Sequence, residues 1–291
     1  MNVLFAGLGS MGLGMAQSLL RAGHAVQGVD PDASRVALLR TDSGVVDVDQ
    51  PDALVSAVLN ADQTRAVLFG ADGLANRLRP GGVIVSCATV APAFAREMEA
   101  EAQARGLLYL DAPISGGAAK AATGQLSIMA SGSADTFDAA APLLDAMAET
   151  VHRLGDSAGA GSAMKAVNQL LAGVHIAAMG EAMGFAASQG LDLRQVVQVI
   201  GASAGQSFMF DNRAPHVVDA DYTPRSKVDI WLKDLGIVTD IAESAGLPLP
   251  VMQEALTQFR ATSAAGMGTE DDAAIAKHVA RQAGVTLPGD D

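Results

Sequence analysis

Three glycines near the start of the chain have the spacing of a phosphate-binding turn. The sequence GLGSMG at 7–12 places Gly7, Gly9 and Gly12 between an apolar run at 2–6 and a helical pattern at 11–22. In such a turn the first glycine permits a tight bend, the second lets amides approach a pyrophosphate, and the third allows close helix–strand packing. The helix N-terminus adds amide donors and the positive end of its dipole. The motif predicts a dinucleotide site, with a purely structural turn as the alternative.

An acidic residue follows the glycine turn at the distance that ribose binding requires. Asp30 ends the next apolar run and lies 18 positions after Gly12. An acid about 20 residues beyond such a turn binds the adenosine ribose in dinucleotide-binding domains. Its carboxylate repels a 2′-phosphate, so NAD is predicted over NADP, although Arg35 offers a cation that can pair with such a phosphate. The alternative for Asp30 is a turn or helix-capping residue.

A lysine interrupts a nearly uncharged helical pattern in the second half of the chain. Lys165 ends the sequence GAGSAMK at 159–165, and Asn168, three positions later, shares its face of the helix. Partial burial lowers the pKa of a lysine toward neutrality, where the amine can exchange a proton. The pair predicts an acid–base site. The alternative is a lysine that extends to solvent from the helix start.

A hydroxyl and two adjacent glycines form a third cluster. Ser115, Gly116 and Gly117 end the sequence DAPISGG at 111–117, which follows a predicted strand. Such a segment can present a hydroxyl and backbone amides to a carboxylate. The alternative is a flexible linker with turn glycines.

The composition favours a folded protein that binds a small molecule. Of the 291 residues, 49% are hydrophobic and 18% are charged, which is normal for a globular chain. The net charge of −13 repels phosphate backbones and anionic lipids, so we expect neither nucleic acid nor a membrane as partner. The most weakly charged stretch, 166–180, is shorter than the roughly 20 residues of a membrane helix.

Cysteine and histidine usage argues against a metal site. Cys87 is the single cysteine, which excludes an internal disulfide and multi-cysteine metal sites and indicates a reducing, cytoplasmic setting. The five histidines are scattered without metal-ligand spacing. We therefore expect no metal cofactor.

Strand and helix patterns alternate through the first half of the chain. Apolar runs at 2–6, 26–29, 53–59, 83–86 and 107–110 alternate with helical patterns at 11–22, 33–40, 64–79 and 93–105. The alternation predicts an α/β, doubly wound domain of the Rossmann type around a parallel sheet. Further runs at 126–130 and 151–154 flank a helix at 134–147 and are expected to complete this sheet.

An all-α region follows the glycines at 155–161. Helices are expected at 162–189, 193–202, 229–245, 250–265 and 271–283. We predict two domains: 1–160 for NAD, and 161–291 for substrate binding and oligomerisation. The first helix is as apolar as a buried helix, so we expect other helices to enclose it, from this chain or from a second subunit.

Four motifs together resemble those of the β-hydroxyacid dehydrogenase family, which includes 3-hydroxyisobutyrate dehydrogenase and tartronate semialdehyde reductase. In chain order they are GLGSMG at 7–12, DAPISGG at 111–117, GAGSAMK at 159–165 and KDLG at 233–236. The likeness spans nearly the whole chain. Segments at 206–213, 221–224 and 228–236 look most like the L-threonate dehydrogenase subfamily.

The resemblance implies a role for each motif. Lys165 is similar to the catalytic lysine of the family, and Asn168 with the segment 115–117 is similar to its substrate site. Thr89 matches a serine or threonine near the nicotinamide, with a helix N-cap as the alternative. Lys233 is similar to a cofactor contact, with a solvated surface pair as the alternative. The expected cofactor contacts are Gly7, Leu8, Gly9, Ser10, Met11, Gly12, Asp30, Leu59, Thr89 and Lys233.

The implied activity is NAD-dependent hydride transfer between a small anionic hydroxy acid and the nicotinamide, with Lys165 as general acid/base. L-threonate or a similar short sugar acid is the favoured substrate, and 3-hydroxyisobutyrate and tartronate semialdehyde are the alternatives. A catalytically silent NAD-binding scaffold or sensor is the alternative from another class. The family also implies a homodimer or homotetramer.

Two positions depart from the relatives. Gln125 stands where the family usually has threonine. Asn168 and Gln169 replace the His-Asn pair that 6-phosphogluconate dehydrogenases carry after the lysine, which disfavours phosphogluconate chemistry.

Overall fold

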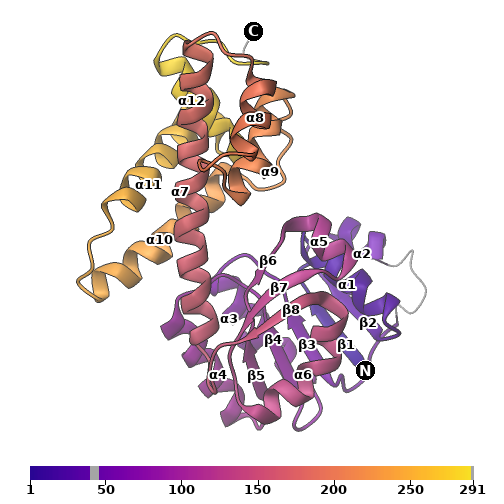
Figure 1. Ribbon diagram of the computed structural model, residues 1–291. Coiled ribbons are helices and arrows are strands. Elements are labelled where there is room, and N and C mark those ends of the chain that lie inside the picture. The colour runs from indigo at the N-terminus through magenta and orange to yellow at the C-terminus, as the bar shows by residue number, and fades with distance from the viewer. Residues whose placement is uncertain (40–45, 290–291) are drawn as a thin grey trace. The chain divides into compact units, whose positions relative to one another are not determined.

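A parallel five-stranded sheet forms the centre of the first of two compact units, Met1–Lys165 (Figure 1). The computed structural model describes residues 1–39 and 46–289. The strands are β1 (Asn2–Ala6), β2 (Ala25–Val29), β3 (Ala53–Ser56), β4 (Val83–Ser86) and β5 (Leu108–Asp111). Their order is β2-β1-β3-β4-β5, so the direction of winding reverses between β1 and β3. Open α/β sheets bind ligands at the carboxyl ends of the strands beside such a reversal.

The segment 46–48 runs beside β2 without forming a strand. The Val46 amide donates to Val26 O at 3.4 Å, and the Val48 amide donates to the side-chain Oε1 of Gln27 at 3.2 Å. The described sheet therefore ends at β2.

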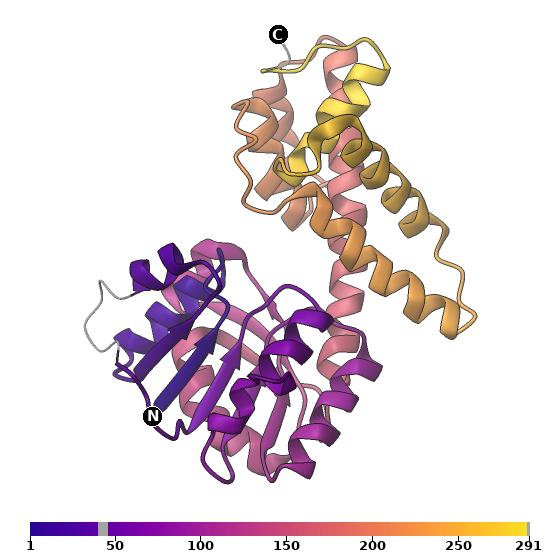
Figure 2. The ribbon, with the colours of Figure 1, turned by 180° about the vertical axis from the view of Figure 1, so that it is seen from behind.

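Helices cover both faces of the sheet, because neighbouring residues of each strand point to opposite sides (Figures 1 and 2). Val3 and Phe5 of β1 pack with α1 (Gly12–Arg21) and α6 (Ala134–Met147). Leu4 packs on the other face with α3 (Ala61–Phe69) and α4 (Pro92–Ala104). The remaining helices are α2 (Ala33–Leu39), the 3₁₀ turn η1 (Leu74–Arg77) and α5 (Gly117–Thr123). This arrangement confirms the doubly wound class.

Two sequence expectations for the helices need adjustment. The pattern at 64–79 is two elements, because the chain leaves the helix at Gly70, whose backbone is extended, before η1 begins. The helix expected at 33–40 ends at Leu39, and residue 40 lies outside the described residues.

A separate three-stranded sheet follows β5, which corrects the prediction that 126–130 and 151–154 complete the main sheet. Its order is β6-β7-β8, with β6 (Ile114–Ser115), β7 (Leu126–Ala130) and β8 (Ala148–Arg153). β7 pairs antiparallel with β6 and parallel with β8. Because β7 pairs with β6, its link to β5 is reduced to a bridge between Asp111 and Ser131.

In the second unit, Ala166–Asp291, the described elements are all helices or helical turns, joined by loops and one isolated β-bridge between Lys227 and Asp271, as the sequence predicts for an all-α region. Its α-helices are the remainder of α7 (Ala160–Ser188), α8 (Leu193–Gly201), α9 (Phe208–Val218), α10 (Val228–Ser244), α11 (Pro250–Thr262) and α12 (Ile275–Gln282). A π turn, η2 (Ser263–Met267), and a 3₁₀ turn, η3 (Asp272–Ala274), connect α11 to α12. The two units divide after Lys165, inside α7, whereas the sequence predicts a domain boundary after residue 160.

The sequence does not predict α9, because Pro215 and the polar residues at 211–213 interrupt its apolar periodicity. A signal was present at its start, where Ser207 caps the helix by accepting from the Phe210 amide at 3.0 Å.

Helix α7 is the one described helix that is long and apolar enough to cross a membrane, and 44% of its most apolar window is buried. It has 29 residues, close to the helix expected at 162–189, and so extends beyond the weakly charged stretch at 166–180. Ile176, Met179 and Met183 lie in the core of the second unit. We therefore interpret α7 as a core helix.

Candidate active site

The glycine turn after β1 has no room for a side chain at two of its positions. Gly7 has φ of +89°, and a Cβ there would lie 2.7 Å from Ala57 O. A Cβ on Gly12 would lie 1.8 Å from Gly7 O. At Gly9 the nearest atom to a Cβ would be Arg35 Nη1, at 3.9 Å, so this glycine faces open space. The turn thus has the tight bend, the close packing and the open approach that a pyrophosphate site needs.

A further glycine, which the sequence analysis did not single out, sets the packing beside the turn. A Cβ on Gly14 would lie 2.7 Å from Ala122 N, so α1 and α5 approach each other closely. Ser18 Oγ donates to Ala121 O at 3.0 Å across the same contact. The repeated glycine spacing in GLGSMGLG at 7–14 was the available signal.

Asp30 connects the end of β2 to the glycine turn. Its Oδ2 accepts from the Leu8 amide at 2.7 Å, and its Oδ1 accepts from the Asp32 amide at 2.9 Å. Arg35 Nη1 lies 3.7 Å from the same carboxylate and Arg35 Nε lies 3.5 Å from Asp32. The turn-forming alternative is therefore realised in part. A carboxylate has about four lone-pair sites, so the capacity to accept ribose hydroxyls remains.

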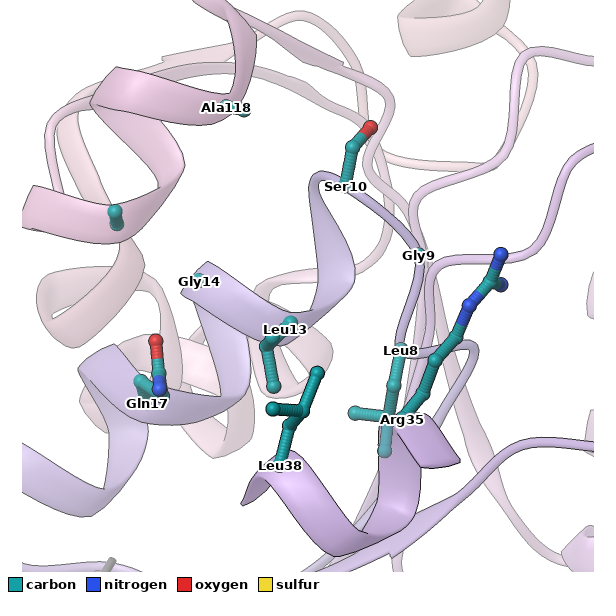
Figure 3. A pocket seen from close by; sticks show the side chains of 10 residues that line it. Leu8, Gly9, Ser10, Leu13, Gly14, Gln17, Arg35, Leu38 and Ala118 are labelled. Carbon is teal, nitrogen blue, oxygen red and sulfur yellow. The ribbon is translucent and has the colours of Figure 1, made fainter. Parts of the chain in front are cut away.

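A pocket of about 370 Å³ borders the turn on the side of α2 and α5 (Figure 3). Figure 3 shows Arg35 beside Gly9, and Leu13 facing Leu38 across the pocket floor. Lys165 and Ser115 do not line it. The lining residues are Leu8, Gly9, Ser10, Leu13, Gly14, Gln17, Arg35, Leu38, Ala118 and Ala122.

Two further cofactor candidates lie beyond the carboxyl ends of neighbouring strands. Leu59 follows β3, is 51% exposed, and donates its amide to Gln63 Oε1 at 2.9 Å. Thr89 follows β4, and the N-cap of α4 is Ala91, so the interpretation of Thr89 as that cap is wrong. Both positions lie at the sheet edge where ligands bind in this fold class.

The segment Ser115–Gly117 is ordered by the elements on either side, which corrects the flexible-linker alternative. Ser115 belongs to β6 and pairs with Ser127 of β7, and Gly117 begins α5. Gly116 and Gly117 have φ of +134° and +78°, so consecutive left-handed residues turn the backbone between strand and helix. Residues with a side chain rarely adopt such values.

Lys165 lies against this segment within the first unit. Its Nζ donates to Ile114 O, immediately before Ser115, at 2.8 Å. Lys165 is 8% exposed, so the alternative of a lysine that extends to solvent is wrong. The structure thus brings together the lysine and the serine–glycine cluster that the sequence predicts.

Asp111, which sequence reasoning did not place in the site, anchors the start of α7. Its carboxylate, 1% exposed, accepts from the amides of Gly159 and Ser162 at 2.9 Å each and from Ser162 Oγ at 2.7 Å. Ser131 Oγ lies 3.3 Å from it. Burial raises the pKa of Asp111, and these hydrogen bonds oppose that rise. The anchor joins β5 to the first turn of α7 and so sets the position of Lys165.

The other candidates form a polar chain inside the second unit. Asn168 Nδ2 donates to Gln169 Oε1 at 2.9 Å, and Gln169 Nε2 donates to Asp234 Oδ2. Asp234 Oδ1 pairs with Lys233 Nζ at 2.6 Å. Because Asp234 is only 3% exposed, the interpretation of Lys233 and Asp234 as a solvated surface pair is wrong.

Other reactive groups do not add to the site. Burial raises the pKa of the Cys87 thiol to about 12, which leaves it without nucleophilic character near neutral pH. Among residues 1–39 and 46–289, no group of three or more His, Cys, Asp or Glu side chains is arranged to hold a metal ion.

Comparison with known proteins connects both halves of the chain to dehydrogenases. Residues 2–155 match the family described as the NAD-binding domain of 6-phosphogluconate dehydrogenase. Residues 159–279 match the family described as NAD-binding of NADP-dependent 3-hydroxyisobutyrate dehydrogenase.

Individual relatives align over nearly their full length. The chain is 45% identical to L-threonate dehydrogenase of Escherichia coli K12, covering 99% of this chain and 97% of the relative. It is 46% identical to L-threonate dehydrogenase of Cupriavidus necator, covering 99% and 98%. A crystal structure of 3-hydroxyisobutyrate dehydrogenase from Salmonella typhimurium, 47% identical, matches with a TM-score of 0.91 over 95% of this chain and 99% of that one.

Proposed function

The chain belongs to the 3-hydroxyisobutyrate dehydrogenase-like family of β-hydroxyacid dehydrogenases, and we propose that it oxidises L-threonate or a similar short sugar acid with Lys165 as general acid/base. The comparisons confirm the predicted family, the predicted fold class and the predicted NAD-dependent hydroxyacid dehydrogenase activity. One observation carries the proposed role of Lys165: the 2.8 Å hydrogen bond from its Nζ to Ile114 O holds the lysine beside Ser115 and its glycines.

NAD, when bound, accepts the hydride. The open space at Gly9 and the amides at the start of α1 are suited to its pyrophosphate, and the Asp30 carboxylate to its adenosine ribose. Arg35 is paired with Asp30 and Asp32, which offsets its attraction for a 2′-phosphate. This charge arrangement supports NAD over NADP. Leu59, Thr89 and Lys233 complete the proposed cofactor contacts.

The substrate carboxylate is assigned to Ser115, Gly116 and Gly117. The Ser115 hydroxyl and the amides around two left-handed glycines offer several donors within one short segment. Local capture of this kind is needed because the net charge of −13 repels an anionic substrate at long range.

Lys165 Nζ would accept the substrate hydroxyl proton as the alcohol carbon is oxidised to a carbonyl. Lys165 is 8% exposed and its Nζ is held at Ile114 O beside Ser115, which supports this role. Asn168 lies one turn further along α7 and would orient the substrate or the lysine. Precise orientation of this kind contributes much of the rate in acid–base enzymes.

Initial rates with a panel of acids test the substrate. The panel contains L-threonate, D-threonate, D-glycerate, 3-hydroxyisobutyrate and 6-phosphogluconate, each with NAD and with NADP. We expect the highest kcat/KM for L-threonate with NAD. A higher kcat/KM for 3-hydroxyisobutyrate would reject the proposed substrate and favour the activity for which the Salmonella relative is named. NAD binding without turnover of any acid would favour the scaffold or sensor.

A second proposal concerns self-association in the cytoplasm. Met164, Val167, Leu171 and Phe185 are 44–68% exposed and follow one side of α7 at helical spacing. We propose that a second copy of the chain covers this stripe in a homodimer or homotetramer. Light scattering should report a multiple of 29.5 kDa for the native chain and a smaller mass for Leu171→Glu. A native monomer would contradict the proposal.

A further inference from the structure

We propose that Gln169 and Asp234 are positioning residues that fix the orientation of the Asn168 amide, so that Asn168 offers its carbonyl oxygen, Oδ1, toward the substrate. The inference rests on the proposed function, because it concerns the residue assigned there to orient the substrate or Lys165. It adds two residues to the site and a reason for the glutamine that distinguishes this chain from 6-phosphogluconate dehydrogenases.

Close helix packing brings the two residues together. Gln169 is on α7 and Asp234 is on α10, 65 positions apart in the chain. One turn beyond Gln169, a Cβ on Gly173 would lie 2.9 Å from Leu235 Cδ2 and 3.2 Å from the Trp231 ring. Glycine at 173 thus lets α10 approach α7 closely enough for the neighbouring polar side chains to meet.

The contact between Gln169 and Asp234 is buried. Gln169 is 8% exposed and Asp234 is 3% exposed. A buried amide or carboxylate that loses its hydrogen-bond partner is destabilised, so neither side chain readily adopts another orientation. The Gln169 side chain is therefore held in one conformation.

The chemistry of the carboxylate decides which way the glutamine amide faces. A carboxylate paired with an ammonium only accepts hydrogen bonds, and Asp234 Oδ1 lies 2.6 Å from Lys233 Nζ. Gln169 must therefore turn its Nε2 toward Asp234 and its Oε1 the other way. The usual ambiguity of an amide orientation does not arise at this position.

The orientation of the Gln169 amide determines that of the Asn168 amide. Because Gln169 Oε1 can only accept, Asn168 turns its Nδ2 toward it, at 2.9 Å. Asn168 Oδ1 then faces away from Gln169 as a hydrogen-bond acceptor. An acceptor at this position can bind a hydroxyl group of a hydroxy-acid substrate or an ammonium group, both of which donate hydrogen bonds.

The test changes the two polar side chains at 169 and 234 one at a time and then together. Gln169→Leu removes the amide, and Asp234→Asn leaves an amide that can either donate or accept. Gln169→Glu places a second carboxylate against Asp234. The double variant Gln169→Glu/Asp234→Asn restores one carboxylate, which accepts from Asn168 on one side and from the new amide at 234 on the other.

We expect each single variant to lower kcat about tenfold for the best acid of the panel, because an imprecisely held group costs this much or more. The NAD dissociation constant of Gln169→Leu should stay near the native value, since that variant keeps the Lys233–Asp234 pair. The double variant should recover kcat to within about threefold of the native enzyme, as expected for coupled neighbours.

Two control variants separate positioning from general damage. Thr262→Val removes another fully buried polar group of the second unit, whose hydroxyl donates to Gln258 O. Asp229→Asn removes an exposed carboxylate five positions before Asp234 on α10. Both should keep the native kcat. Melting temperatures measured for all variants will show whether Gln169→Leu is less stable than Thr262→Val.

Three results would overturn the inference: native kcat in Gln169→Leu, the same loss in Thr262→Val, or a double variant no faster than either single variant. Lys165→Met tests the proposed function separately. If Lys165→Met is inactive and Gln169→Leu is fully active, the positioning role alone is wrong. If Lys165→Met keeps native kcat, the proposed function is wrong whatever the Gln169 and Asp234 variants show.

Discussion

In each unit of the molecule a buried aspartate supports a lysine of the candidate site, but the two aspartates do so differently. In the first unit, Lys165 donates to a backbone carbonyl and Asp111 bonds the start of the helix that carries the lysine. In the second unit, Lys233 contacts the aspartate itself, at 2.6 Å from Asp234. Asp111 therefore positions the helix that carries its lysine, whereas Asp234 forms an ion pair with its lysine directly.

The difference matches the tasks proposed for the two lysines. The Asp234 carboxylate holds the Lys233 ammonium in place through an ion pair, which suits a lysine that binds a cofactor. The carbonyl contact directs Lys165 without a formal negative charge, which suits a group that gains and loses a proton. Asp111 can still control Lys165, through the backbone.

Removal of each lysine should give the largest contrast. We expect Lys165→Met to lower kcat by about 10³-fold, because a positioned acid–base group contributes between about 10² and 10⁴. Lys233→Met should mainly raise the KM for NAD, by about tenfold, through one lost charged contact. Steady-state kinetics with both substrates varied distinguishes the two. Equal kcat losses in both variants would contradict the division of roles.

The Asp111 anchor should matter most for stability. Asp111→Ala leaves the buried amide of Ser162 and its hydroxyl without their acceptor, so we expect the free energy of unfolding to fall by about 3 kcal/mol. Urea denaturation measures this loss. Asp138→Ala, at an exposed position of α6, is the matched control and should change stability by less than about 0.5 kcal/mol. If the two variants are equally stable, Asp111 is not an anchor.

The same comparison shows what the sequence could reveal. The glycine turn, Lys165 with Asn168, and Ser115 with its glycines were predictable because their chemistry is set by residues within a few positions of one another. The supporting contacts were not, because Asp111 bonds residues 48 and 51 positions away and Gln169 bonds a residue 65 positions away. Sequence patterns report local periodicity, whereas these contacts depend on the complete fold.

The fold elements likewise divide into those that local sequence patterns predict and those that depend on distant contacts. Strands and helices with strong periodicity lie within a few residues of their predicted bounds. Assignment of 126–130 and 151–154 to the main sheet was wrong because sheet membership depends on which strand becomes the neighbour, and β6, only Ile114–Ser115, is too short to show a strand pattern.

Asp271, another buried aspartate of the second unit, should make the stability of the protein depend on pH. Asp271 is fully buried; burial alone would raise its pKa, but the His216 ring and the Arg225 amide hold the pKa below its ordinary value. A lowered folded pKa contributes stability above the unfolded pKa and loses it as pH falls through the folded value.

Asp271→Asn should therefore lower the free energy of unfolding by about 2 kcal/mol at pH 7, with a difference that shrinks as pH falls below about 4. The fluorescence of Trp231, the single tryptophan, reports unfolding of this unit. For Asp111 the sign is opposite: its raised folded pKa removes stability as pH rises from the unfolded value. A pH-independent difference at Asp271 would contradict this account.

The smallest expected effect concerns cofactor choice. Asp30→Asn keeps an oxygen that can accept from the Leu8 amide but removes the charge that repels a 2′-phosphate. It also frees Arg35 from one of its carboxylate partners, so we expect the ratio of kcat/KM for NAD over NADP to fall about tenfold. Asp32→Asn removes the other carboxylate near Arg35 and serves as the control, with a smaller change expected because Asp32 does not bond the glycine turn. An equal change in both variants would mean that charge near Arg35, and not the position of Asp30, sets the preference.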